Sequence, residues 1–335
     1  MTKTSAAQVL LPIWQRVLRR PSIDANDKFF SLGGNPSSAG RLFFEIAEVC
    51  GRDLPPVLIY LAPTIAMLTA VLEKSDAPRL PPLLLLKAGT EYPPIFVAHG
   101  LGDTVFGLFH LVNKIESSRP IYGMQARGLD GVDEPFTSIE EMARFHVDAI
   151  KQLQPQGPYS LIGYSLGGLA TLEIAQRLLA DGEKVGLLAL VDSYPHRSHL
   201  AVAQQVRLSS RLAKRMIESA LGRIRSQTSE DREAHTSRKS SHDSPAHSAM
   251  KRMRAAEQLA LRRYHPRFYP GTIKFVKAEI RTYFPDNPVA VWSHLTQEFH
   301  VETTPGDHLN MLTTHVDKLG LLLSAYLQKS PAPRK

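Results

Sequence analysis

The hydrophobic pattern at the start of the chain is helical. Apolar residues spaced three and four apart predict a first helix, with one face made by Leu10, Ile13, Trp14, Val17 and Leu18. Further helices are predicted over residues 36–49 and 65–72. We therefore expect residues 1–75 to form a small helical domain, followed by a proline-rich linker over residues 76–92.

From Pro93 the pattern changes to short apolar runs that alternate with amphipathic stretches. The runs that predict buried strands are residues 95–98, 120–124, 158–162, 187–191, 272–276 and 299–303. Residues 139–153 predict an amphipathic helix between them. Because strands that alternate with helices imply a mostly parallel sheet covered on both faces, residues 93–330 are predicted to be an α/β domain.

The strand pattern lapses over residues 196–264. Residues 202–224 and 250–263 are helical in period, whereas residues 226–248 are rich in Ser, Asp, Arg and His and are predicted to be disordered. An insertion ahead of the last strands is the usual place for the lid of a hydrolase. We therefore expect a helical lid at about residues 196–264.

Composition narrows the class of protein. The chain has 335 residues, of which 43% are hydrophobic and 21% charged, which is ordinary for a globular protein with one large and one small domain. Its single cysteine, Cys50, excludes an intramolecular disulfide and fits a reducing compartment. No apolar run approaches the ~18 residues of a membrane helix, and no signal peptide is apparent. A cytoplasmic location is expected.

The net charge of +8 raises the question of nucleic-acid binding. Much of the excess lies in residues 207–263, which show neither the zinc-ligand spacing nor the interleaved aromatic residues of nucleic-acid modules. We interpret this region as a solvated basic face, with a surface for an acidic protein partner as the alternative. Neither nucleic-acid binding nor a metal site is expected.

The stretch from Gly163 to Gly167, Gly-Tyr-Ser-Leu-Gly, lies between a predicted strand and a strong helix-forming segment. A serine on a sharp strand-to-helix turn is the nucleophile elbow of many hydrolases. The flanking glycines let the strand and the helix approach each other so that the Ser165 hydroxyl stands clear. Ser165 is the predicted nucleophile.

A serine nucleophile needs a base and an acid that orients the base. His308 follows the last predicted strand, at the sheet edge where such folds present catalytic groups, and is the predicted base. Asp192, at the carboxyl end of strand 187–191, is favoured as the acid over Asp286 in the loop after the next strand. Asp307 is adjacent to the base and cannot easily reach its Nδ1.

Two backbone amides are expected to form an oxyanion hole. One belongs to Leu166, the residue after the nucleophile. The other lies in the glycine-rich loop after the first buried strand, where Leu101 is the expected donor and Gly102 the alternative. His99 is expected to support this loop.

Taken together, these residues resemble the thioesterase domain that ends nonribosomal peptide and polyketide synthases. The resemblance covers about residues 93–327 and rests on four segments, residues 93–100, 163–168, 191–194 and 305–309. It implies an α/β-hydrolase fold with a helical lid. In that family the acid follows the strand after the elbow helix, which supports Asp192.

Residues 5–73 resemble the acyl or peptidyl carrier domain that precedes such thioesterases, through segments 29–35 and 62–65. This resemblance implies a small four-helix domain. In that family a serine next to the position of Asn35 carries a phosphopantetheine arm. Pro36 stands there and has no hydroxyl. Ser37 is the remaining candidate for attachment, although one step along a helix turns a side chain by ~100°.

The resemblance implies a serine thioesterase. Such an enzyme would release an acyl, peptidyl or polyketide chain from a carrier-protein or coenzyme A thioester through an acyl-Ser165 intermediate. Its expected partners are the thioester substrate and a carrier protein or synthase acting in trans. Two alternatives stay open, a carboxylester hydrolase with the same triad and a non-catalytic interaction module.

Overall fold

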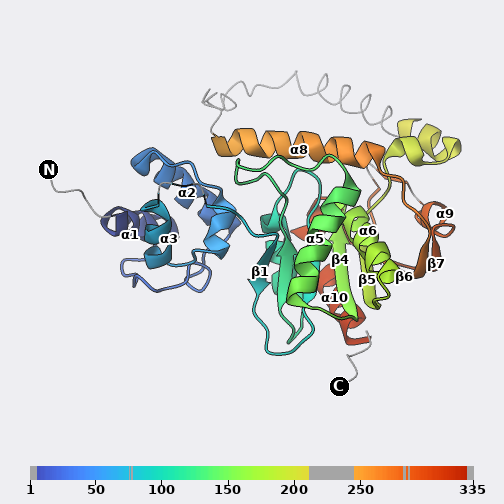
Figure 1. Ribbon diagram of the computed structural model, residues 1–335, viewed down its shortest axis with the longest axis horizontal. Helices are drawn as coiled ribbons and strands as arrows, with labels where there is room; N and C mark the ends of the chain where they lie inside the picture. The colour runs from blue at the N-terminus through green and yellow to red at the C-terminus, as the bar shows by residue number, and fades with distance from the viewer. Residues whose placement is uncertain are drawn as a thin grey trace, which may run out of the picture.

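A small helical domain lies beside a larger α/β domain in the computed structural model of this chain (Figure 1). The structure describes residues 6–74, 76, 78–210, 245–281, 284–285 and 287–329. Within these ranges, no helix combines the length and the apolar character that crossing a membrane requires.

The small domain, residues 6–74, packs its helices around one apolar core. Its elements are α1 (Ala6–Leu18), α2 (Pro36–Cys50), the 3-10 helix η1 (Pro56–Tyr60) and α3 (Ile65–Leu72). Asn35 and Thr64 cap α2 and α3, because their side chains accept backbone N–H groups of the first turn. The predicted apolar faces meet in the core, where Trp14 packs edge-on against Phe29.

The large domain is built on a seven-stranded sheet with the order β1-β3-β2-β4-β5-β6-β7. Its strands are β1 (Leu83–Lys87), β2 (Ile95–Ala98), β3 (Ile121–Met124), β4 (Tyr159–Tyr164), β5 (Val185–Val191), β6 (Tyr269–Ala278) and β7 (Thr296–Thr304). β1 runs antiparallel to β3, and all other neighbours are parallel. Because parallel strands end at the same edge, the loops after β2, β4, β5 and β7 converge there.

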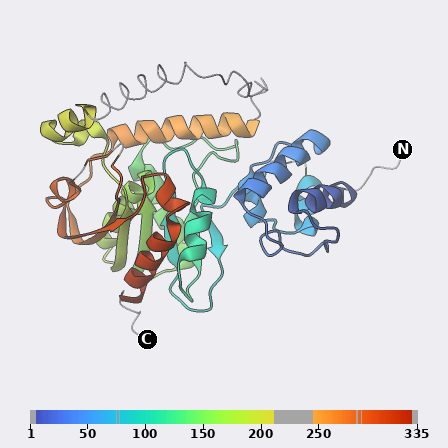
Figure 2. The ribbon, with the colours of Figure 1, turned by 180° about the vertical axis from the view of Figure 1, so that it is seen from behind.

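Helices cover both faces of the sheet, as Figures 1 and 2 show from opposite sides. α5 (Ile139–Leu153) and α6 (Leu166–Ala180) pack on one face, and α4 (Phe109–Lys114) and α10 (Val316–Lys329) on the other. Adjacent residues alternate between the two cores, as a pleated strand requires: Phe96 faces α5 and α6, whereas Val97 faces α4 and α10.

The remaining elements lie mainly in loops at the sheet edges. They are η2 (Val105–Leu108), η3 (Arg197–His199), α8 (Pro245–Arg263), α9 (Val289–Trp292) and η4 (Asn310–Leu312). α8 is the long helix that runs across one end of the sheet in Figure 1, and its first turn reaches the small domain. It belongs to the expected lid.

Two expectations from the sequence differ from the structure. The expected linker, residues 76–92, contains strand β1, whose Leu84 is buried because β1 pairs along β3. Residues 245–248, expected to be disordered, form the start of α8, where Pro245 suits a first helical turn. The rest of that expected disordered segment lies outside the described residues.

An aromatic cluster joins the two domains. Phe30 of the small domain packs against Phe109, and Tyr60 packs against Phe106, with ring centroids 5.4 Å apart in both pairs. Phe30 and Tyr60 also contact each other. The buried residues Val57, Val105 and Met253 continue this contact toward α8. The small domain is thus packed on the large one rather than merely tethered to it.

Candidate active site

Ser165 occupies a strained turn between β4 and α6. Its backbone angles are φ 55° and ψ −119°, which few residues other than glycine adopt. The two glycines around it permit this turn, since a β-carbon at Gly163 would lie 2.3 Å from the Gly167 carbonyl oxygen, and one at Gly167 would lie 2.4 Å from that of His99. The turn therefore depends on Gly163 and Gly167, as the sequence analysis predicted.

A continuous hydrogen-bonded chain runs from Ser165 through His308 to Asp192. The His308 Nε2 lies 3.1 Å from the Ser165 Oγ, and its Nδ1 lies 2.9 Å from the Asp192 Oδ2. Asp192 follows β5, which pairs with β4, and is 1% exposed. The structure thus brings together the three side chains that the sequence singled out.

Of the other two candidate acids, Asp286 lies outside the described residues. Asp307 instead shapes the turn before η4, because its Oδ1 accepts the backbone N–H groups of Leu309 and Asn310. This use of the Asp307 carboxylate agrees with the expectation that it cannot reach round to the imidazole Nδ1.

Three residues that the sequence analysis missed hold this chain in place. The ring of Tyr164 stacks on His308 with centroids 4.8 Å apart, and its hydroxyl donates to the His308 carbonyl oxygen. Burial, with a smaller contribution from Asp192, raises the pKa of the Tyr164 phenol, which keeps it a donor. Phe284 packs on the imidazole at 4.6 Å, and the Arg281 guanidinium lies 3.6 Å from the Asp192 carboxylate.

Of these three residues, only Tyr164 had a local signal. It is the variable position inside the elbow motif, directly before the nucleophile. Arg281 and Phe284 follow β6 and reach the site only because β6 lies next to β5 in the sheet. No spacing in the sequence connects them with Asp192 or His308.

The backbone N–H groups at the predicted oxyanion hole differ in whether they already donate a hydrogen bond within the protein. Gly102 N–H donates to the Glu257 Oε2 of α8 at 2.6 Å and is therefore taken. Among the described residues, no acceptor takes the N–H of Leu166 or Leu101. His99 supports this loop, as expected, through its Nδ1, which lies 2.9 Å from the Gly100 carbonyl oxygen.

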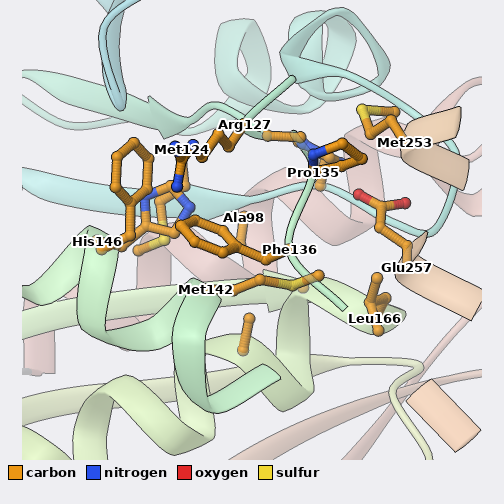
Figure 3. A pocket seen from close by; sticks show the side chains of 15 residues that line it. Ala98, Met124, Arg127, Pro135, Phe136, Met142, His146, Leu166, Met253 and Glu257 are labelled. Atoms are coloured by element: carbon orange, nitrogen blue, oxygen red, sulfur yellow. The ribbon is translucent and has the colours of Figure 1, made fainter. Parts of the chain in front are cut away.

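A mostly apolar pocket lies next to the elbow, between α5 and α8 (Figure 3). The space inside it, mouth included, amounts to about 540 Å³, and Leu166 and Gly167 form part of its wall. Figure 3 places Glu257 at one side and His146 at the other. Burial, assisted by His99, lowers the pKa of His146 to about 3, so this imidazole is neutral at physiological pH.

The start of α2 contains the residues considered for attachment of a phosphopantetheine arm. Pro36 is the first residue of α2 and has no hydroxyl. The Ser38 hydroxyl is buried and bonded to the Asn35 backbone, both as acceptor and as donor. Ser37 is exposed and carries the only remaining hydroxyl of this turn. For metals, the described residues contain no cluster of three or more His, Cys, Asp or Glu side chains that could bind one.

Comparison with known proteins matches both parts of the chain. The sequence model of the thioesterase domain matches residues 94–325, and that of the phosphopantetheine attachment site matches residues 8–72. The chain is 35% identical over 195 residues to a dimodular nonribosomal peptide synthase of Bacillus subtilis (strain 168). It is 34% identical over 182 residues to an indigoidine synthase of Dickeya dadantii (strain 3937). These alignments cover 58% and 54% of this chain but only 8% and 12% of the two relatives.

Solved structures resemble the fold. Holo-AB3403, a four-domain nonribosomal peptide synthetase bound to AMP and glycine, matches 95% of this chain and 26% of its own, with a TM-score of 0.62 and 21% identity. The NocB thioesterase domain, in covalent complex with a fluorophosphonate nocardicin G analog, matches 71% of this chain and 95% of its own, with a TM-score of 0.53 and 22% identity. Since the thioesterase-domain model alone accounts for more than half of the sequence, the chain belongs to the thioesterase-domain family.

Proposed function

We propose that this chain is a serine thioesterase that releases an acyl or peptidyl chain from a thioester through an acyl-Ser165 intermediate. The observation that carries the proposal is the hydrogen-bonded chain Ser165–His308–Asp192, located at the carboxyl edge of the sheet in a member of the thioesterase-domain family. A serine with a hydrogen-bonded base and an oriented acid is the arrangement that acyl transfer requires.

The proposed reaction has two halves. As the Ser165 Oγ attacks the thioester carbonyl carbon, its proton passes to the His308 Nε2, and Asp192 stabilises the imidazolium. The N–H groups of Leu166 and Leu101 stabilise the oxyanion. The carbon–sulfur bond then breaks, and the thiol leaves with the proton from His308. Water, or a nucleophilic group of the bound acyl or peptidyl chain itself, then attacks the carbonyl carbon of the acyl-enzyme, with His308 as the base.

We propose that substrate reaches Ser165 from a separate carrier protein or from a small thioester, not from the small domain. Pro36 at the attachment position supports this view, since an ester to phosphopantetheine needs a hydroxyl. The small domain would then act as a docking element. We also propose a boundary before β1 rather than at Pro93, because β1 is part of the sheet. A cytoplasmic location, inferred from the single cysteine, completes the proposal.

A thiol-release assay tests the proposal. The full chain is incubated with acyl thioesters of N-acetylcysteamine and, in parallel, with oxygen esters of the same acyl groups. We expect thiol release that exceeds hydrolysis of the matched oxygen ester and disappears in Ser165→Ala. Preference for the oxygen esters would indicate a carboxylester hydrolase instead. No turnover of either class would favour an interaction module.

A further inference from the structure

A single buried carboxylate sits in the wall of the pocket beside the elbow. Glu257, on α8, is 4% exposed, and its one hydrogen bond among the described residues is the 2.6 Å bond from the Gly102 N–H. That amide lies one peptide unit from the Leu101 N–H, the proposed oxyanion donor, about 3.8 Å along the chain from one α-carbon to the next. The carboxylate therefore stands close to the position of the reacting carbonyl.

Among the described residues, no lysine or arginine forms an ion pair with this group. His99 faces the carboxylate and favours its charged form, but the His99 Nδ1 donates to the Gly100 carbonyl oxygen, and Asp103 adds a second negative charge nearby. Arg254 lays its stem over Gly102, yet among the described residues it forms no ion pair with Glu257. Burial, the largest influence, raises the pKa of the Glu257 carboxyl and outweighs the opposing effects of His99 and the Gly102 N–H.

An unpaired anion at this place opposes the reaction, because negative charge develops on the substrate oxygen a short distance away and like charges repel strongly in a water-poor site. A positively charged group on the substrate removes that conflict, since it pairs with the carboxylate and also lies near the oxyanion. Most of the remaining wall is apolar, with Met142, Phe136 and Met253 in it, and suits a hydrocarbon side chain (Figure 3). The cation of this wall, Arg127, is engaged elsewhere, because its guanidinium lies over the Phe136 ring and 3.7 Å from the Asp133 carboxylate.

We propose that this pocket selects acyl groups that carry an amino group next to the thioester carbonyl, and that the Glu257 carboxylate binds that amino group. The substrate class is thus an α-aminoacyl thioester with an apolar side chain. The inference rests on the proposed thioesterase activity and specifies its substrate. If Glu257 served only as a latch, that is, as a structural hydrogen bond between α8 and the Gly102 loop, its replacement would affect all thioesters equally.

The test compares three thioesters of N-acetylcysteamine that share one aromatic side chain, namely phenylalanyl, N-acetylphenylalanyl and phenylpropionyl. The first has a free amine, the second an amide and the third no nitrogen. Each is assayed with the wild type and with Glu257→Gln, which keeps an oxygen for the Gly102 N–H but loses the charge. Glu134→Gln is the matched control, because Glu134 is exposed and directly precedes Pro135 in the pocket wall.

We expect Glu257→Gln to lower kcat/KM for the phenylalanyl thioester by about 10- to 100-fold, the range of a hydrogen bond to a charged group, and to leave the other two nearly unchanged. The comparison between enzymes is decisive, since an α-ammonium group also raises the intrinsic reactivity of the carbonyl. Glu134→Gln should leave all three rates as in the wild type. Labelling of Ser165 by a fluorophosphonate at the wild-type rate verifies that the variant site is intact.

Two results would overturn the inference, and only the second of them would also refute the proposed thioesterase function. An equal loss with all three thioesters would identify Glu257 as a latch and leave the thioesterase function standing. Failure of the wild type to release thiol from any of the three, despite fluorophosphonate labelling, would refute the proposed function and this inference together.

Discussion

The Asp53 carboxylate of the small domain accepts a hydrogen bond, 2.7 Å long, from the backbone N–H of Ala246 in the first turn of α8. The first N–H groups of a helix have no partner within the helix, so an acceptor from elsewhere stabilises its start. In this chain the acceptor comes from 193 residues earlier in the sequence. The small domain therefore helps to fix the helix that carries Glu257.

Replacing Asp53 tests this coupling. We expect Asp53→Ala to destabilise the first turn of α8 by about 1 kcal/mol, the usual loss for a missing helix cap. Faster amide hydrogen exchange in peptides that cover residues 246–252 is the measurement. Asp53→Asn, which retains an acceptor oxygen, should exchange nearly as slowly as the wild type. Unchanged exchange in Asp53→Ala would show that α8 does not depend on the small domain.

Removing the nucleophile should abolish acyl transfer without unfolding the protein. We expect Ser165→Ala and His308→Ala each to lower kcat by about 10⁴- to 10⁶-fold, and the double variant to lose little more, because the residues act as a unit. Circular dichroism should match the wild type. The assignment would be refuted by fluorophosphonate labelling of a serine other than Ser165, located by peptide mass mapping.

Substitutions of Asp192 and Asp286 should have very different effects on kcat. We expect Asp192→Asn to lower kcat by up to about 10⁴-fold, because the amide no longer fixes the imidazole tautomer or stabilises the imidazolium. Asparagine also tolerates the left-handed backbone of this position, where φ is 43°. Asp286→Asn should change kcat by less than about threefold, within the small effect expected of a residue outside the triad. The reverse ranking in steady-state assays would move the acid to the later loop.

The carrier-like turn can be tested by mass. Incubation with coenzyme A and a broad-specificity phosphopantetheinyl transferase should leave the intact mass unchanged, since Pro36 has no hydroxyl and Ser38 is engaged in the cap. Pro36→Ser should restore modification if the turn still docks the transferase. Stoichiometric modification of the wild type, mapped to Ser37 by fragmentation, would contradict this and would revive loading by the chain's own small domain.

The buried imidazole of His146 should make the stability of the fold depend on pH. Its pKa falls from 6.5 to about 3 on folding, so between these values the unfolded chain binds the extra proton and acidification destabilises the folded state. Relative to pH 7, this residue alone should lower the free energy of unfolding by roughly 2 kcal/mol at pH 5. Urea denaturation at both pH values should show a smaller acid loss in His146→Gln. The exposed His110→Gln serves as control and should lose as much stability as the wild type.

Local sequence determined much of the fold. The helix over Ile139–Leu153 has the predicted bounds, because its apolar face, N-cap and length all agree. The elbow could likewise be predicted from the sequence, because its glycines are required by steric contacts within a few residues of Ser165. The prediction of a linker over residues 76–92 was wrong for β1, because a leucine run at a sheet edge looks like a linker until its partner strand is known.

Sequence also nominated Ser165, Asp192 and His308, because each stands at a strand end and parallel strands end together. Only the tertiary structure decided what surrounds them. Tyr164 and Phe284 clamp the imidazole, and Arg281 faces Asp192, through the order of strands in the sheet. The same holds for Glu257, which meets Gly102 from 155 residues away. Periodicity reports only on neighbours along the chain, whereas contacts of this kind arise when distant elements pack against one another.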